Sequence, residues 1–96
     1  MYELRFTKAA ERYFKKIKEQ GLKTAFRNAL ATISSDPYVG DLKTGDLAGI
    51  YGYDVYYAGT NYEIAYRIYE DGDKIVVVIL AGTRENFYNE LKHYMK

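Results

Sequence analysis

The spacing of hydrophobic and polar positions changes along the chain and separates helical from extended segments. In the first third, apolar residues recur every three or four positions, which is typical of one face of an α-helix. This spacing predicts helices at 8–20 and 22–33. Elsewhere apolar and polar residues alternate, which predicts strands at 2–6, 50–57 and 62–69.

The most apolar stretch, at 74–81, is aliphatic and largely β-branched. A run of this kind is typical of a strand that is covered on both faces. Gly82 and Thr83 end it, and 84–94 is predicted to be a helix. Arg84 therefore lies where a buried strand ends and a helix begins, beside backbone N–H groups and the positive end of a helix dipole. Such a junction can hold a phosphate, but it is also an ordinary strand–helix connection, and the pattern leaves both interpretations open.

Short turn-forming segments connect the predicted elements. We expect Gly21 to end the first helix and to join the two helices in an antiparallel hairpin. Thr7 is placed to cap the first helix at its N-terminus. Residues 39–49 are rich in Gly, Asp and Thr, which predicts a loop that Leu42 and Leu47 attach to the core.

The predicted fold is α+β, with the elements in the order β-α-α-β-β-β-α in one domain of residues 1–96. A mainly antiparallel, twisted sheet of four strands carries the helical hairpin on one face and the C-terminal helix at the margin of the other. The alternation along 62–69 turns Tyr62, Ile64 and Tyr66 to the core and Glu63 outward. The partly open face is predicted to present Asp54, Tyr56, Glu63 and Arg67 near Arg84 and Tyr88.

Composition narrows the classes of site that the chain can carry. It has no cysteine and one histidine, which excludes thiolate zinc sites and cysteine nucleophiles, and no carboxylate cluster stands out. We therefore expect no metal and no cofactor. The chain also has no run of about 18 apolar residues and no leader sequence, so we expect a cytoplasmic protein without a membrane partner.

Charge and tyrosine are unevenly distributed. Residues 1–35 carry eight Lys or Arg and three Asp or Glu, whereas residues 36–96 carry six and ten. The basic part is either the solvated side of two helices or a surface for an acidic partner. Seven of the twelve tyrosines lie between Tyr51 and Tyr69. They are either packing residues of a sheet or a platform on which nucleic-acid bases stack.

Two stretches resemble the RelE/ParE superfamily of bacterial toxins from type II toxin–antitoxin modules. Residues 62–68 are similar to the third strand of the family, in which two tyrosines enclose an arginine and apolar residues. Residues 79–85, followed by Tyr88, are similar to its closing apolar-Gly-x-Arg-Glu motif. Length and element order agree over nearly the whole chain. The resemblance implies a toxin that arrests growth and a cognate antitoxin protein as its partner.

RelE-type members are mRNA interferases, so the resemblance implies a metal-independent endoribonuclease that acts on mRNA in the A site of the 30S ribosomal subunit. A ribose 2′-hydroxyl attacks the adjacent phosphodiester and leaves a cyclic phosphate. In this family Arg84 corresponds to a residue that stabilises the transition state, and Tyr88 to one that orients the RNA. ParE-type members instead bind and inhibit DNA gyrase without catalysis, and this alternative uses the same fold.

The resemblance also marks three differences from RelE-type toxins. Where those toxins carry a second arginine and two lysines, this chain has Glu63, Asp54 and Tyr56. In one interpretation Glu63 is the general base, while Arg67 and Arg84 hold the phosphate. In another, Glu63 is a surface residue that pairs with Arg67 or with a cross-strand basic group. The predicted catalytic set is Arg84, Tyr88, Glu63, Tyr56 and Arg67.

Overall fold

The computed structural model describes residues 1–95, and its main elements follow the predicted order with one additional strand. Two short 3₁₀ helices, η1 and η2, flank that strand. The elements in chain order are β1 (Glu3–Phe6), α1 (Lys8–Lys16), α2 (Gln20–Ser35), η1 (Pro37–Val39), β2 (Asp41–Leu42), η2 (Gly45–Leu47), β3 (Tyr51–Tyr57), β4 (Thr60–Tyr69), β5 (Ile75–Thr83) and α3 (Arg84–Met95).

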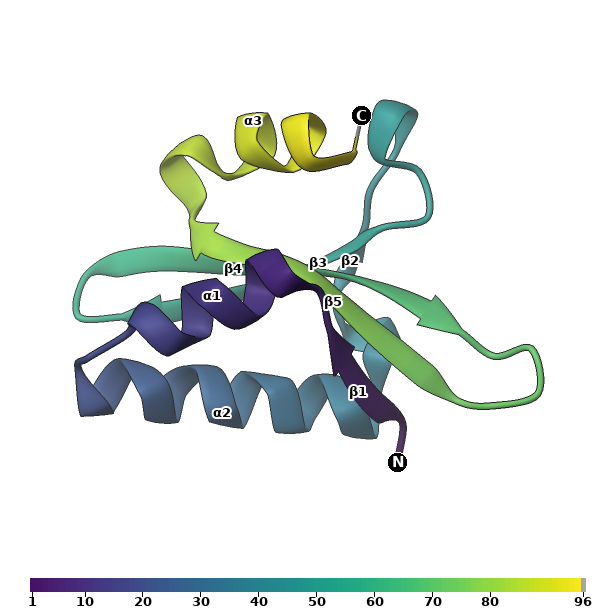
Figure 1. The fold of residues 1–96 in the computed structure, drawn as a ribbon, viewed down its shortest axis with the longest axis horizontal. Helices are drawn as coiled ribbons and strands as arrows, with labels where there is room; N and C mark the ends of the chain where they lie inside the picture. The colour runs from purple at the N-terminus through teal and green to yellow at the C-terminus, as the bar shows by residue number, and fades with distance from the viewer. Residues whose placement is uncertain (96) are drawn as a thin grey trace.

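Within residues 1–95, five strands form one sheet in the order β1-β5-β4-β3-β2 (Figure 1). β1 runs parallel to β5, and the remaining neighbours are antiparallel. The predicted α+β class with a mainly antiparallel sheet is confirmed, but the sheet has five strands instead of four. The additional strand, β2, lies inside the predicted loop and pairs with Tyr51 and Gly52. Its two residues are too few to show an alternating pattern.

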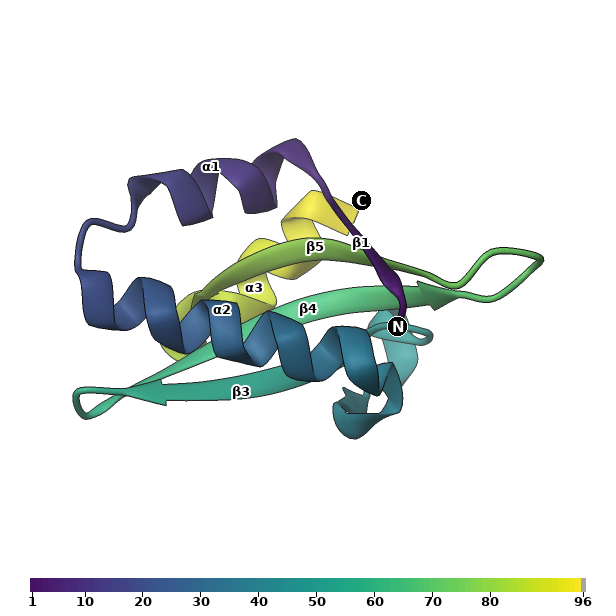
Figure 2. The ribbon, with the colours of Figure 1, turned by 90° about the horizontal axis from the view of Figure 1, so that it is seen from below.

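The helical hairpin covers one face of the sheet (Figure 2). Its core includes the buried side chains of Phe26, Ile33 and Tyr66. Thr7 caps α1 as predicted, because its hydroxyl oxygen accepts a hydrogen bond from the backbone N–H of Ala10. The first helix, however, ends at Lys16.

Gly21 does not end the first helix and instead lies in the first turn of α2. A Cβ at this position would collide with the hydroxyl group of Tyr57. A larger residue at position 21 would therefore have to displace the end of the Tyr57 side chain. The predicted helix end was wrong because α1 already ends at Lys16 and α2 begins at Gln20.

The opposite face of the sheet is covered by α3, which lies above it in Figure 1. Phe87 and Leu91 are buried there in a second core with Ala65 and Ile79. A bulge leaves Ile79 without a partner between the pairs Ala65–Leu80 and Tyr66–Val78. The prediction that β5 is covered on both faces is confirmed.

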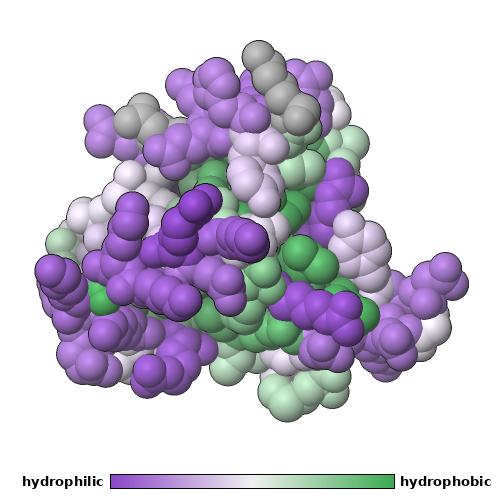
Figure 3. All heavy atoms as spheres, viewed as in Figure 1, coloured by the Kyte–Doolittle hydropathy of each residue, from purple (hydrophilic) through white to green (hydrophobic). Residues whose placement is uncertain are grey.

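The segment that precedes β3 completes this second layer. Leu47 is buried and attaches the segment to the second core, as predicted. Leu42 is 57% exposed on β2 at the edge of the sheet, so its predicted packing was wrong. In Figure 3, polar side chains gather over the side of the helical hairpin that faces the viewer. Among the described residues, no helix is long and apolar enough to cross a membrane.

Candidate functional site

The register of the sheet decides which chemistry-bearing side chains meet beneath α3. Asp54 on β3 lies opposite Glu63 on β4, and Glu63 lies opposite Gly82 on β5. Arg84 follows two residues after Gly82 and begins α3. Tyr88 lies one helical turn later, so it shares a face of α3 with Arg84. Three strands, β3, β4 and β5, and the helix α3 thus bring side chains from distant parts of the chain together.

Glu63 is the centre of this group and is only 1% exposed. Its carboxylate accepts hydrogen bonds from the Tyr88 hydroxyl at 3.1 and 3.2 Å. It also lies 3.3 Å from Lys43 Nζ and 3.8 Å from Arg84 Nε. A buried carboxylate is costly unless it is paired and hydrogen-bonded, and these partners satisfy both conditions. Glu63 lies, as predicted, on the face away from the helical hairpin and near Arg84 and Tyr88. The expected solvent exposure and the pairing with Arg67 were wrong, because α3 covers Glu63 and Lys43 approaches it from the loop.

Lys43 follows β2 and was not among the predicted site residues. Its Nζ donates a hydrogen bond to the Tyr88 hydroxyl at 2.6 Å and lies 4.9 Å from the centroid of the Tyr88 ring. Burial by itself lowers the pKa of Lys43, but the hydrogen bond to Tyr88 and the charge of Glu63 outweigh burial, so that the pKa is raised. Lys43 is therefore a cation at neutral pH.

Gly52 on β3 provides the space in which Lys43 reaches Glu63. A Cβ on Gly52 would collide with the Glu63 carboxylate and would lie 2.7 Å from Lys43 Cε and 3.0 Å from Lys43 Nζ. Glycine inside a strand is unfavourable for the strand itself and often marks a close approach. This glycine was the one signal in the sequence that pointed to an incoming side chain, although it could not identify Lys43.

Arg84 occupies the exposed side of the group. Its Nη1 lies 3.2 and 3.3 Å from the two carboxylate oxygens of Asp54. The pKa of Arg84 is raised, first by the charge of Asp54 and then by that of Glu63. The side chains of Arg84 and Asp54 are 47% and 38% exposed, so the pair contributes at most about 1 kcal/mol and an anion can compete for the guanidinium.

The two remaining predicted residues lie outside this contact network. Tyr56 is two residues beyond Asp54 on the same side of β3 and is 74% exposed, which places an available ring at the rim. Arg67 is four residues beyond Glu63, so their Cα atoms are about 13 Å apart along the strand. Its guanidinium lies beside the backbone of Gly49. The predicted role of Arg67 at the phosphate therefore has no geometric support.

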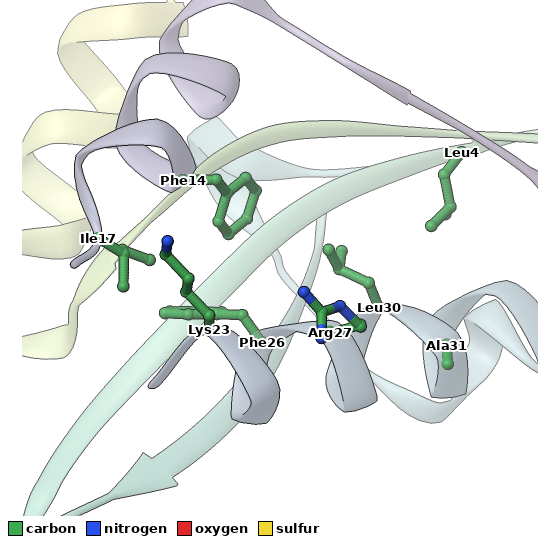
Figure 4. A pocket seen from close by; sticks show the side chains of 8 residues that line it. All are labelled: Leu4, Phe14, Ile17, Lys23, Phe26, Arg27, Leu30 and Ala31. Atoms are coloured by element: carbon green, nitrogen blue, oxygen red, sulfur yellow. The ribbon is translucent and has the colours of Figure 1, made fainter. Parts of the chain in front are cut away.

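Two hollows in the surface differ in chemistry. One, of about 500 Å³, lies between the segment that follows β2 and α3, and Lys43, Tyr88 and Lys92 contribute to its wall. The other, of about 420 Å³, lies on the helical-hairpin layer (Figure 4). It is lined mainly by aliphatic and aromatic side chains together with Lys23 and Arg27. The first hollow adjoins acid–base groups, and the second offers an apolar binding surface with positive charge. Among residues 1–95, no group of three or more His, Cys, Asp or Glu side chains is placed to hold a metal ion.

A family model described as a ParE-like toxin of type II bacterial toxin–antitoxin systems matches residues 4–92. The chain belongs to this family. This match confirms the predicted membership of the RelE/ParE superfamily. No curated protein matches its sequence.

Solved toxin structures share the fold of the ParE-like toxin. The toxin–antitoxin complex RelBE2 from Mycobacterium tuberculosis contains a chain that is 31% identical, with a TM-score of 0.66 over 86% of this chain and 98% of that one. The intact Escherichia coli RelBE complex matches at 20% identity and a TM-score of 0.69, over 88% and 99% of the two chains. A free variant of E. coli toxin RelE matches at 19% identity and a TM-score of 0.71, over 95% and 92%. The two E. coli likenesses concern the fold alone.

Proposed function

We propose that this ParE-like toxin arrests growth by cleaving RNA without a metal at the group formed by Glu63, Tyr88 and Arg84. One observation supports the proposal above all. The Tyr88 hydroxyl is held between a buried carboxylate and an ammonium group, one helical turn from a half-exposed guanidinium. Acid–base groups and a cation at one point are what phosphodiester transesterification requires.

In the proposed reaction, the 2′-oxygen of a ribose attacks the adjacent phosphorus. The 2′-hydroxyl gives its proton to the Tyr88 oxygen while Tyr88 passes its own proton to Glu63. The bond from phosphorus to the 5′-oxygen breaks, and that oxygen takes a proton from water. The products are a 2′,3′-cyclic phosphate and a free 5′-hydroxyl, after which Glu63 returns its proton through Tyr88 to solvent. Glu63 is buried, so it acts through Tyr88 instead of touching the ribose.

Arg84 stabilises the negative charge that develops on the phosphate oxygens. To do so it exchanges Asp54 for the phosphate, which offers a comparable pair of acceptor oxygens and more charge. The exposed pair with Asp54 is weak, so this exchange costs little. Tyr56 at the rim is free to stack on a base of the RNA. That the RNA is messenger RNA in the ribosomal A site rests on the resemblance to RelE-type toxins.

Arg84→Ala tests this proposal. We expect the variant to fold and to cleave RNA about 100-fold more slowly or worse, because loss of one preorganised donor to a developing charge has this effect. RNA from induced cells is mapped for cleavage while growth is followed. Arg5→Ala is the matched control, because Arg5 also forms an exposed ion pair, at 2.9 Å with Glu3, far from the site. An Arg84→Ala protein that is as toxic as the wild type and still cuts RNA contradicts the proposal.

A second candidate function is favoured by the charge balance of the site. Lys43 is paired with Glu63 and Arg84 with Asp54, so the group holds no surplus positive charge for a phosphorane. A ParE-type toxin that binds DNA gyrase needs no such charge. A supercoiling assay run beside the RNA-cleavage assay separates the two functions. Inhibited supercoiling with intact RNA supports gyrase binding, and the reverse result supports the ribonuclease.

We also propose a cognate antitoxin as the partner of this toxin. Support comes from the M. tuberculosis RelBE2 structure, which is a toxin–antitoxin complex. The apolar hollow with Lys23 and Arg27 suits an amphipathic segment that carries acidic residues (Figure 4). A structure of the complex in which this hollow stays empty contradicts the placement of the antitoxin.

A further inference from the structure

We infer that Lys43 is a positioning residue of the RNA-cleaving site, which directs the Tyr88 hydroxyl toward Glu63 and balances the buried charge of Glu63 from a loop. This inference rests on the ribonuclease function proposed above. It adds a residue that lies outside both stretches that carry the family resemblance. Four features of the structure support it, namely the direction of the hydrogen bonds, the charge of Glu63, the space above Gly52 and the hollow beside Tyr88.

The hydrogen-bonding capacity of the groups sets the direction of the Tyr88 hydroxyl. An ammonium group has donors only, so the Tyr88 oxygen must accept at the 2.6 Å contact with Lys43 Nζ. The single O–H of Tyr88 is then free to point at the Glu63 carboxylate, which accepts at 3.1 and 3.2 Å. One lone pair of the oxygen remains for the proton of a substrate. Lys43 thus selects the one arrangement in which Tyr88 can pass a proton to Glu63.

Lys43 also provides the opposite charge that a buried carboxylate needs. Its Nζ lies 3.3 Å from Glu63, whereas Arg84 Nε is 3.8 Å away and the Arg84 guanidinium is shared with Asp54. Without Lys43, the site would have a buried carboxylate whose main cationic partner is half exposed. Removing one partner of a buried pair is strongly unfavourable, so Glu63 would have to change its protonation or its position.

The backbone holds Lys43 in place for this contact. Its N–H donates to the carbonyl oxygen of Ile50 at 2.8 Å, which continues the pairing of β2 with β3 by one residue. The side chain then crosses Gly52, where the absence of a Cβ leaves room for both Lys43 and Glu63. Gly52 leaves the space for the contact between Lys43 and Glu63, and the backbone hydrogen bond to Ile50 anchors Lys43. The contact is therefore built into the fold.

A hollow in the surface adjoins Lys43 and Tyr88. Both Lys43 and Tyr88 line the hollow of about 500 Å³ beside α3, a volume in the range of ligand sites. The Tyr88 side chain, which Lys43 and Glu63 hold in place, therefore borders this hollow.

The test is a double-mutant cycle on the cleavage rate. Lys43→Met, Tyr88→Phe and the double variant are made by cell-free synthesis, purified and mixed in excess with ribosomes that carry a labelled messenger RNA. The rate constant at saturation and the protein concentration for half-saturation are measured, and circular dichroism reports the folded fraction. Lys18→Met removes the same charge from the exposed α1–α2 connection and serves as the control. Lys43→Gln, which keeps an N–H donor, replaces Lys43→Met if the latter does not fold.

We expect Lys43→Met to lower the saturated rate constant by about 100-fold while half-saturation is unchanged, because the loss concerns proton transfer and not RNA binding. The double variant should be no slower than Tyr88→Phe, because Lys43 acts through the hydroxyl that Tyr88→Phe removes. A Lys43→Met protein with the wild-type rate constant overturns the inference, and so do effects that multiply in the double variant. A wild-type protein that cuts no RNA instead overturns the proposed function, and this inference with it.

Discussion

Gly52 and Gly82 flank Glu63 from two strands, and one added methyl group should have opposite effects at these positions. At Gly52 the new Cβ meets the Glu63 carboxylate and the stem of Lys43. If either side chain retreats, the ion pair between Lys43 and the buried Glu63 is weakened. Overpacking of this kind costs about 1–3 kcal/mol. In a domain of this size, the melting temperature falls by about 4–8 °C for each kcal/mol.

Gly82 lies opposite Glu63 on β5, but its surroundings are open enough for a methyl group. The nearest atoms to a Cβ there are Phe87 Cδ1 at 3.8 Å and Glu90 Oε2 at 3.9 Å, both at ordinary van der Waals distance. The backbone of Gly82 is ordinary strand and does not have a positive φ. Gly82→Ala should therefore stabilise the fold by about 0.4–1 kcal/mol, because alanine restricts the unfolded chain more than glycine does.

Urea and thermal unfolding, followed by circular dichroism, measure both changes on otherwise identical proteins. We expect Gly52→Ala to lower the midpoint and Gly82→Ala to keep or raise it, with the same dependence on urea in all three proteins. If Gly52→Ala is as stable as the wild type, the space above Gly52 does not serve the contact between Lys43 and Glu63. If both variants lose the same stability, the cause is a general strand effect.

Two further predictions concern parts of the fold away from the site. Thr7→Ala should lower the free energy of unfolding by about 1 kcal/mol, since Ala10 N–H loses its cap, whereas Thr7→Ser should not; equal urea midpoints for the two variants would contradict this. The pKa of Glu70 is lowered from 4.5, first by the hydrogen bond from Tyr2 and then by the one from Tyr38. Because the folded pKa is below the unfolded one, the stabilisation is present above the unfolded pKa and is lost as the pH falls through the folded pKa. The melting temperature should therefore fall more steeply below about pH 4.5 in the wild type than in Glu70→Gln, and parallel pH curves for the two proteins would contradict this assignment.

The local elements of the fold were predictable because their signals are local. The helical periodicity of the first third, the cap at Thr7 and the apolar run of β5 each depend on residues close together in the chain. The junction at Arg84 could be located for the same reason, and the structure places Tyr88 one turn beyond it on the same helix. Gly21 shows the limit of such signals. The local pattern predicted a helix end at this residue, whereas the structure places it inside α2, against the side chain of Tyr57 from a distant strand.

The set of residues that form the site was less predictable, because it depends on how the strands pair and on which face of the sheet α3 covers. Alternation along β4 correctly separated Glu63 from Ile64, but it could not show that α3 covers the face to which Glu63 points. Lys43 comes from a segment whose two-residue strand is too short for a pattern, and its partners lie 20 and 45 positions away in the sequence.

By itself, the sequence determined the class of fold, the order of its elements and the strand–helix junction that carries Arg84 and Tyr88. The tertiary structure decided that Glu63 is buried, that Lys43 is its partner and that Arg67 lies apart. The physical reason is that helices and strands form from neighbouring residues, whereas the pairing of a buried charge is settled only when distant segments are packed together.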